Sequence, residues 1–260
     1  MKKILLVGLG FLCLGLIFSA SSAHAVSTSF GEAYIDWGTM EFSGISIMWL
    51  EQGSYSDAYV YAATELGDVD DGDGDWLDAW TDTSAQASVS GAESSAWTSD
   101  TQLGATVSLA PDGINTDFAY GEAGAEYYGE LVALEDGFLC FSVDYFISQN
   151  LSAPCPDDWA ESWVSVGAEL SSYNGDQDER WLENYVEDGE SGYWDDSGTL
   201  TVSLWFNEGD EAIFYAWADC EGCAYSEYCE EIPEPATMLL LGSLATGLFS
   251  MASLRRKFKR

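Results

Sequence analysis

Basic side chains and histidine are almost absent from the body of this sequence. Of its eight Lys and Arg residues, seven lie among the first three or the last six positions, and Arg180 is the single basic residue between them. The one histidine is His24, near the N-terminus. These absences exclude Ser-His triads, lysine Schiff bases and most phosphate or metal-assisted chemistry, so we predict that the protein is not an enzyme. A carboxylate pair that hydrolyses glycosides is the enzymatic alternative that remains.

Acidic residues, in contrast, are abundant. All 45 lie between Glu32 and Glu234, so this region carries 45 negative charges against the one positive charge of Arg180. Such a surface repels nucleic acid and anionic lipid, which excludes both as partners, and it attracts divalent cations. A highly charged chain can be disordered, but 11 Trp, 14 Tyr and 12 Phe give this one an apolar content well above a disordered composition.

The first 25 residues have the pattern of a secretory signal peptide. Lys2 and Lys3 form a positively charged start, an apolar run from Ile4 to Phe18 follows, and Ala23-His24-Ala25 is a small-x-small cleavage site. We therefore expect the secretion machinery to export the chain, and signal peptidase to leave a mature protein that starts at Val26.

The last 29 residues, 232–260, have three parts in a fixed order. Pro233, Glu234 and Pro235 come first, and an uncharged apolar run, 236–254, follows. At ~1.5 Å per residue this run would span roughly 28 Å as a helix, close to the hydrocarbon thickness of a bilayer, so we predict one C-terminal transmembrane helix. The chain ends in a basic cluster, which favours the cytoplasmic side and places the preceding chain outside: Arg255, Arg256, Lys257, Lys259 and Arg260.

This combination resembles the tails of PEP-CTERM proteins, which are sorting signals read by an exosortase. The resemblance covers the tail and the secretory leader, and Ile232 stands where that family most often has Val. It implies that an exosortase cuts at or near Pro233-Glu234-Pro235, removes the membrane anchor and releases the body of the protein to the cell surface or the extracellular polysaccharide. The alternative is a permanently tail-anchored protein whose prolines only end a linker.

Residues 26–231 have the periodicity of β-strands. Apolar and polar residues alternate over 84–90, 105–109 and 199–206, and short strands with turn signals at about ten-residue intervals follow one another. We therefore predict an all-β ectodomain, an antiparallel β-sandwich with a jelly-roll-like fold.

Two local features of this region are also predicted. The loop Asn207–Asp210 separates 199–206 from a second alternating run, 211–218, which predicts a hairpin. Trp159 to Leu170 is compatible with a short helix but alternates nearly as well.

Five cysteines remain in the mature region: Cys140, Cys155, Cys220, Cys223 and Cys229. Export into an oxidising compartment predicts disulfides, and the odd number leaves one thiol over. We expect Cys140 to pair with Cys155, and one further bridge to form among Cys220, Cys223 and Cys229. A zinc site on these last three is the alternative, although no histidine is left for a fourth ligand.

An aspartate-rich stretch indicates one cofactor, calcium. Carboxylates interleaved with glycines can wrap a hard cation, and this stretch offers Asp68, Asp70, Asp71, Asp73 and Asp75. The EF-hand pattern does not fit, because Trp76 stands where a glycine is needed, and so we expect only an aspartate-rich calcium loop. A solvated acidic turn is the alternative.

The abundant aromatic residues suggest a carbohydrate partner. Tyr55, Asp57, Tyr59 and Tyr61 are expected to share one strand face, where rings can stack on sugars and carboxylates can bond hydroxyls, although such rings more often cover a sheet. We therefore expect a non-enzymatic cell-surface or extracellular-matrix protein held in exopolysaccharide. The alternative is a carbohydrate-binding or adhesive module with a defined sugar site.

Overall fold

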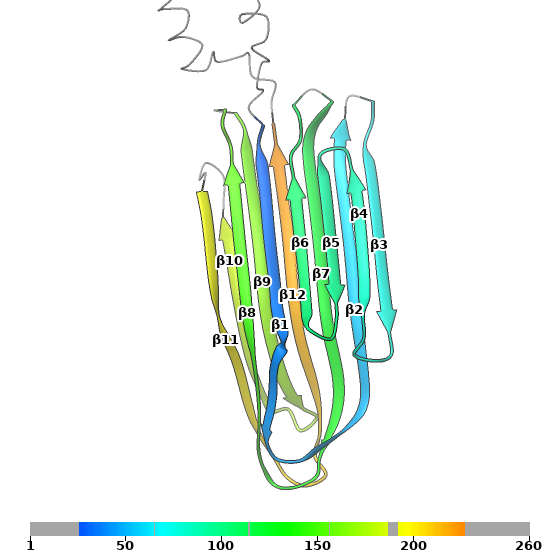
Figure 1. Ribbon diagram of the computed structural model, residues 1–260, viewed down its shortest axis with the longest axis vertical. Coiled ribbons are helices and arrows are strands. Elements are labelled where there is room, and N and C mark those ends of the chain that lie inside the picture. The colour runs from blue at the N-terminus through cyan, green and yellow to red at the C-terminus, as the bar shows by residue number, and fades with distance from the viewer. Residues whose placement is uncertain (1–25, 65, 114, 156, 187–191, 227–260) are drawn as a thin grey trace, which may run out of the picture. The chain divides into compact units, whose positions relative to one another are not determined.

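The computed structural model describes residues 26–64, 66–113, 115–155, 157–186 and 192–226. Within them, twelve strands form two six-stranded antiparallel sheets and there is no helix (Figure 1). Sheet A has the order β11 (Gly192–Phe206), β8 (Gly137–Ser152), β1 (Thr28–Gly44), β6 (Gln102–Leu109), β5 (Ala92–Thr98) and β4 (Thr83–Val89). Sheet B has the order β10 (Gln177–Val186), β9 (Trp159–Ser172), β12 (Glu211–Tyr225), β7 (Thr116–Ala133), β2 (Ile47–Thr64) and β3 (Val69–Leu77).

The sheets pack face to face because apolar residues alternate with polar ones along the strands. In β7 and β12 every second residue is buried, and many of these residues are alanines, such as Ala123, Ala125 and Ala218. Small side chains let the sheets approach closely: a Cβ added to Gly121 of sheet B would lie 3.0 Å from the side chain of Val107 in sheet A. The all-β antiparallel sandwich predicted from this alternation is confirmed.

A second part of the core is aromatic. Trp37 packs against Tyr127 with ring centroids 4.4 Å apart, and Phe141 packs against Phe214 at 4.6 Å. Trp80 joins them and donates its indole N–H to the carbonyl oxygen of Tyr128 at 2.6 Å. Large rings and alanines therefore fill different parts of the same interior.

The consecutive strands β11 and β12 lie in different sheets. β11 pairs with β8, whereas β12 pairs with β7 and β9, so the hairpin predicted from 199–206 and 211–218 is wrong in its pairing although both runs are strands. The Asp210 carboxylate accepts a hydrogen bond from the Asn207 amide at 2.8 Å, and the Gly209 amide donates to the carbonyl of Ala133, at the end of β7. These contacts hold the short turn against sheet B, so it carries the chain across from sheet A.

Two edge strands meet along each side of the sandwich. β3 and β4 lie at one side, and β10 and β11 lie at the other (Figure 1). Trp159 to Leu170, for which the sequence left two possibilities open, belongs to strand β9 and is an inner neighbour of the edge strand β10.

Candidate functional site

The predicted sorting signal lies outside the described residues. This holds for Pro233, Glu234 and Pro235, for the apolar run 236–254, and for the basic cluster Arg255, Arg256, Lys257, Lys259 and Arg260. The signal peptide, 1–25, also lies outside them. In the part of the chain that is described, no helix has the length and hydropathy needed to cross a bilayer.

The aspartate-rich stretch is a strand, and neither the loop nor the turn that the sequence predicted. Asp70, Asp71, Asp73 and Asp75 all belong to β3, at the edge of sheet B, and Asp68 directly precedes it. The Asp71 carboxylate accepts a hydrogen bond from the Ser88 amide at 2.9 Å, and that of Asp73 accepts one from the Gln86 amide at 3.3 Å. Both amides belong to β4, the edge of sheet A, so these carboxylates join the two sheets along one side.

The extended backbone also limits what this stretch can bind. Successive side chains of a strand point to opposite faces, so Asp70 is directed away from Asp71 and Asp73. Among the described residues, no three His, Cys, Asp or Glu side chains are grouped so that they could hold a metal ion. A calcium site here remains a prediction, and the structure shows a second use for two of its five carboxylates.

Replacing Asp71 by Ala is expected to lower the unfolding midpoint by about 2–4 °C, because one charge-assisted hydrogen bond between the sheets is lost. A loss that is the same in calcium chloride and in EDTA, as measured by thermal unfolding, would show that Asp71 acts through this hydrogen bond and not through calcium. Asp70→Ala, on the opposite face of the same strand, is the matched control and should change little. A calcium-dependent rise in the wild-type midpoint that Asp71→Ala abolishes would instead establish the calcium site.

The cysteine pairing predicted from the sequence is wrong. Cys140 is a free thiol, with its Sγ 3.1 Å from the Ser203 hydroxyl, and Cys155 is disulfide-bonded but not to Cys140. Cys140 lies near the start of β8 and Cys155 beyond its far end. The twelve residue steps from Cys140 to Ser152 are extended and cover roughly 40 Å, whereas a disulfide needs Cα atoms about 4.4–6.8 Å apart.

Cys220 and Cys223 are also free thiols, and Cys229 lies outside the described residues. Residues three apart on a strand point to opposite faces, so Cys220 is buried between the sheets whereas Cys223 lies on the outer face of sheet B. This geometry prevents them from bridging each other or sharing a metal ion. Burial raises the pKa of Cys220 well above its ordinary value, and burial together with Glu161 raises that of Cys223 to about 12, so neither is a reactive thiolate.

The outer face of sheet B carries aromatic and acidic side chains together. The strand register places Tyr55, Asp57, Tyr59 and Tyr61 on this face of β2, as their alternation predicts. We call the whole surface the aromatic-acidic face; it is formed by rings and carboxylates of four strands, namely Tyr55, Asp57, Tyr59 and Tyr61 of β2, Phe118, Tyr120, Glu122, Glu126, Tyr128 and Glu130 of β7, Tyr215, Trp217, Asp219, Glu221 and Tyr225 of β12, and Trp159, Glu161 and Trp163 of β9.

The rings of this face form rows across the strands. Tyr61, Phe118, Trp159 and Tyr225 lie in one row, in which neighbouring ring centroids are 5.9–6.3 Å apart. The rows are bordered by carboxylates, and the Tyr120 hydroxyl donates to Glu122 at 2.7 Å. Burial and Glu122 raise the pKa of Tyr120 far above its ordinary value, so its hydroxyl remains a donor at every physiological pH.

Two carboxyl groups on this face lie unusually close together. Asp57 of β2 and Asp219 of β12 both stand opposite Gly124 of β7, the strand between them. A Cβ at Gly124 would lie 3.0 Å from an oxygen of each, so these two oxygens are at most about 6 Å apart. The glycine leaves the space in which the two carboxyls approach each other.

Burial is the main reason why carboxyl groups around Gly124 have raised pKa values. Burial and the neighbouring Asp57 raise the pKa of Asp219 to about 7, although a weak hydrogen bond from the Ser165 hydroxyl, at 3.4 Å, favours the ionised form. Burial, followed by Glu122, raises the pKa of Asp57, and burial raises that of Glu126. At neutral pH this part of the face therefore carries less negative charge than its composition implies.

No sequence pattern predicts the proximity of Asp57 and Asp219, because they lie on different strands. The upper bound of about 6 Å on their separation is compatible with the roughly 5–5.5 Å between the carboxyl groups of retaining glycosidases. Three cavities are lined by residues that the structure describes, and neither Asp57 nor Asp219 lines any of them. The pair lies on the open face of a sheet, and its clearest physical consequence is its effect on stability.

No family model and no curated protein matches this sequence. Among solved structures, a comparison aligns the chain with the C-terminal globular domain of an oligosaccharyltransferase from Pyrococcus abyssi, at 10% sequence identity and a TM-score of 0.13. The alignment covers 75% of this chain and 47% of that chain. A likeness at this TM-score carries no argument about fold or function.

Proposed function

We propose that this protein is a non-enzymatic component of the cell surface or extracellular matrix that associates with exopolysaccharide. It is exported by its signal peptide and sorted by an exosortase at Pro233-Glu234-Pro235, which separates the ectodomain from its membrane helix. The pairing of β1 with β8 and of β2 with β7 is that of a jelly-roll-like winding, whereas β3 and β6, which such a winding also pairs, lie in different sheets.

The observation that carries the proposal is the aromatic-acidic face. Its rings offer apolar surfaces on which sugar rings can stack, and its carboxylates accept hydrogen bonds from sugar hydroxyls. Rows repeated over four strands suit many weak contacts with a polymer. The excess of negative charge keeps the protein soluble and, with divalent cations, allows it to be bridged to acidic polysaccharide.

Affinity chromatography on immobilised polysaccharide tests this proposal. We expect weak retention of the secreted protein on neutral dextran, and retention on alginate that requires calcium and falls with salt. Replacing Trp163 and Trp217 of the aromatic-acidic face by Ala is expected to reduce retention on dextran several-fold, because two stacking surfaces are lost.

Trp205→Ala is the matched control, since Trp205 is an exposed tryptophan on sheet A. It should leave retention unchanged. Passage of the wild-type protein through both columns without retardation, with and without calcium, would contradict the proposal.

A further inference from the structure

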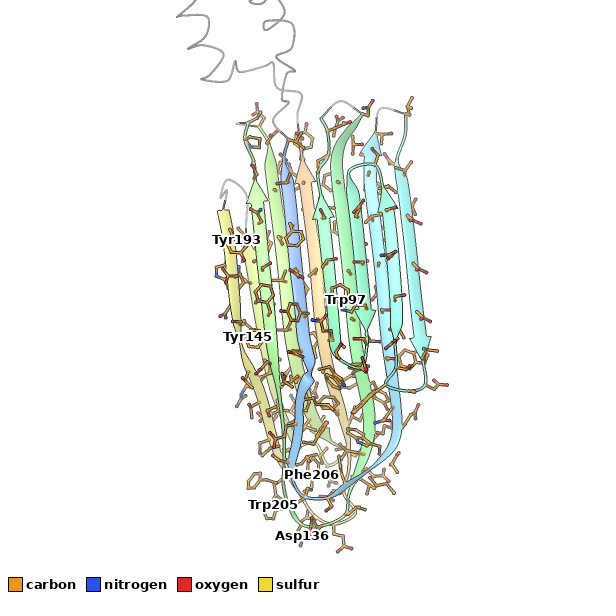
Figure 2. The ribbon with its side chains drawn as sticks, viewed as in Figure 1. Trp97, Asp136, Tyr145, Tyr193, Trp205 and Phe206 are labelled. Carbon is orange, nitrogen blue, oxygen red and sulfur yellow. The ribbon has the colours of Figure 1, made fainter. Side chains whose placement is uncertain are left out.

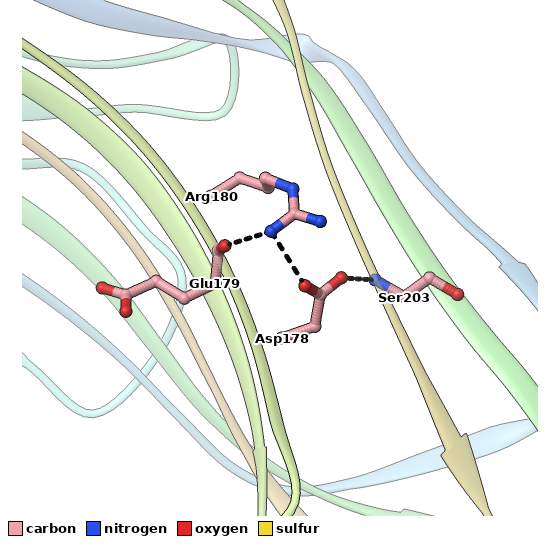
Figure 3. Close-up of polar contacts among 4 residues, drawn as sticks. All are labelled: Asp178, Glu179, Arg180 and Ser203. Atoms are coloured by element: carbon pink, nitrogen blue, oxygen red, sulfur yellow. Dashed lines mark hydrogen bonds and ion pairs between the residues drawn. The ribbon is translucent and has the colours of Figure 1, made fainter.

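The two sides of the sandwich are closed to different extents. Where β3 meets β4, Asp71 and Asp73 bond the backbone of the opposite edge strand, as described above. Where β10 meets β11, the Asp178 carboxylate accepts a hydrogen bond from the Ser203 amide at 2.8 Å and pairs with Arg180 at 3.2 Å (Figure 3). This contact lies near the start of β10 and the end of β11, at one end of this side of the sandwich.

A cavity of about 340 Å³ opens between the other ends of these two strands. We call it the edge cleft, and it is lined chiefly by Gln149 of β8, Asn184, Tyr185 and Val186 of β10, and Tyr193 and Trp194 of β11. Tyr193 lies far along β11 from Trp205 and Phe206, which mark the other end of the same strand (Figure 2). The edge cleft is therefore separate from the contact between Asp178 and Ser203. Residues of both sheets line it.

The floor of the edge cleft is a pair of amide side chains. Gln149 is fully buried, and its amide nitrogen donates to the carbonyl oxygens of Ser162 at 2.7 Å and Asn184 at 3.3 Å. The Asn184 side chain in turn donates one hydrogen to the Gln149 side-chain oxygen at 2.5 Å. Among the described residues nothing bonds the Asn184 side-chain oxygen or its second amide hydrogen, so one donor and one acceptor remain for a ligand.

One wall of the edge cleft is aromatic. Trp194 stands directly opposite Gln149 in the β8–β11 pairing and packs partly against the core, which fixes its ring. Tyr193, the residue before it, is 65% exposed and points to the outer face of sheet A, so the ring of Trp194 forms the aromatic wall. A rigid ring beside a fixed amide pair is the combination that binding pockets use for orientation and affinity.

The chemistry of this lining selects a class of ligand. The described lining of the edge cleft consists of amide, aromatic and aliphatic groups, which suit a neutral ligand with both polar and apolar surface. The acidic surface around it opposes anions. A ring with one apolar face and several hydroxyls fits the aromatic wall and the free amide groups. A volume of 340 Å³, near the lower end for small-molecule pockets, suits one such ring and not a long chain.

We propose that the edge cleft binds a single neutral sugar residue, with its apolar face against the aromatic wall and a hydroxyl bonded to Asn184. This inference rests on the proposed association with polysaccharide and adds a defined sugar site to it. The amide pair and Trp194 point between the two sheets, whereas the aromatic-acidic face points outward; Tyr185 of the cleft lining also borders that face, beside Trp163.

Saturation-transfer NMR on the full-length protein in a zwitterionic, sugar-free detergent tests the proposal. The probes are glucose, galactose, mannose and N-acetylglucosamine, with glucuronic acid as the anionic comparison. We expect saturable binding of at least one neutral sugar, with a Kd on the order of 1 mM as is usual for so small a ligand, and no saturation with glucuronic acid. Failure of all four neutral sugars to saturate, or equal binding of glucuronic acid, would overturn the proposal.

Two variants and two controls locate the binding. Trp194→Ala and Asn184→Asp are each expected to weaken binding of the neutral sugar at least tenfold. Tyr193→Ala removes an exposed ring on the opposite face of β11, so it should bind normally and is the matched control for Trp194→Ala. Trp205→Ala on the same strand should also bind normally. An equal loss in either control, or unchanged binding in the nearly isosteric Asn184→Asp, contradicts the assignment.

The sugar-binding test of the edge cleft and the retention test of the proposed function can fail independently of each other. Retention on dextran through the aromatic-acidic face depends on Trp163 and Trp217, whereas binding in the edge cleft depends on Trp194 and Asn184. Sugar binding without retention would support the edge cleft and contradict polymer binding by the aromatic-acidic face. Retention without sugar binding would support that face and contradict the edge cleft.

Discussion

Replacing Asp219 by Asn is expected to stabilise this protein at pH 8 by up to roughly 4 kcal/mol and to leave its stability at pH 3 almost unchanged. The Asp219 carboxyl has a folded-state pKa of about 7 against an ordinary value of 3.8. An increase of about three units in this pKa on folding corresponds to roughly 4 kcal/mol of unfolding free energy, at about 1.36 kcal/mol per pKa unit.

The sign follows from proton binding. Between about pH 4 and pH 7 the folded protein holds a proton on Asp219 that the unfolded chain has lost, so stability falls as pH rises through this window. Below about pH 4 Asp219 is protonated in both the folded and the unfolded state, so it does not reduce stability there. Asparagine has nearly the same shape and stays neutral at every pH, so the variant should lack this fall.

Urea unfolding at pH 3, 5, 7 and 8 measures the effect. Asp117→Asn, an exposed aspartate of β7, removes one negative charge without relieving a buried carboxyl and is the matched control. Asp57→Asn removes the repulsion from across Gly124 but not the burial of Asp219, which is the larger cause, so it should recover only part of the stability. A gain for Asp219→Asn that is equal at pH 3 and pH 8 would show that Asp219 titrates normally.

This pair of aspartates also shows what the sequence could and could not predict. Alternation along each strand correctly predicted the all-β sandwich and the common face of Tyr55, Asp57, Tyr59 and Tyr61, because a strand's side-chain period is a local property. It could not place Asp219 beside Asp57, since these residues come together only through the register of both strands with β7. The same limit explains the wrong hairpin, where a short turn leads to another sheet.

The errors at the cysteines and aspartates have a related origin. Cys140 and Cys155 are close in the sequence, but β8 continues without turning back and separates them. The aspartate-rich stretch has glycines and charge typical of a loop, yet it forms an edge strand because its backbone pairs with β2, and two of its carboxylates also bond the amides of β4. The amide pair of Gln149 and Asn184 gave no signal either, because two ordinary polar residues become a site only where two sheet edges meet.

Replacing Pro233 and Pro235 by Ala is expected to abolish release of the ectodomain and to leave the chain in the membrane. Proline fixes φ and lacks an amide hydrogen, so the triplet favours an extended segment that a protease can hold. Alanine is the best helix former, and it would allow the apolar helix predicted for 236–254 to extend through the cleavage motif. The change removes no charge and retains Glu234, so it tests backbone conformation in particular.

Intact mass spectrometry of the medium and membrane fractions, in cells that have a working exosortase, measures the result. The wild-type protein should appear outside as a chain that begins near Val26 and ends at or near Pro233-Glu234-Pro235. Ile232→Val is the matched control, because it restores the residue most common before this motif in PEP-CTERM proteins, and it should be released normally. If most wild-type copies keep residues 236–260, or the alanine variant is released as efficiently as the wild type, the tail acts as a permanent anchor. The sandwich would then meet polysaccharide only at the membrane surface.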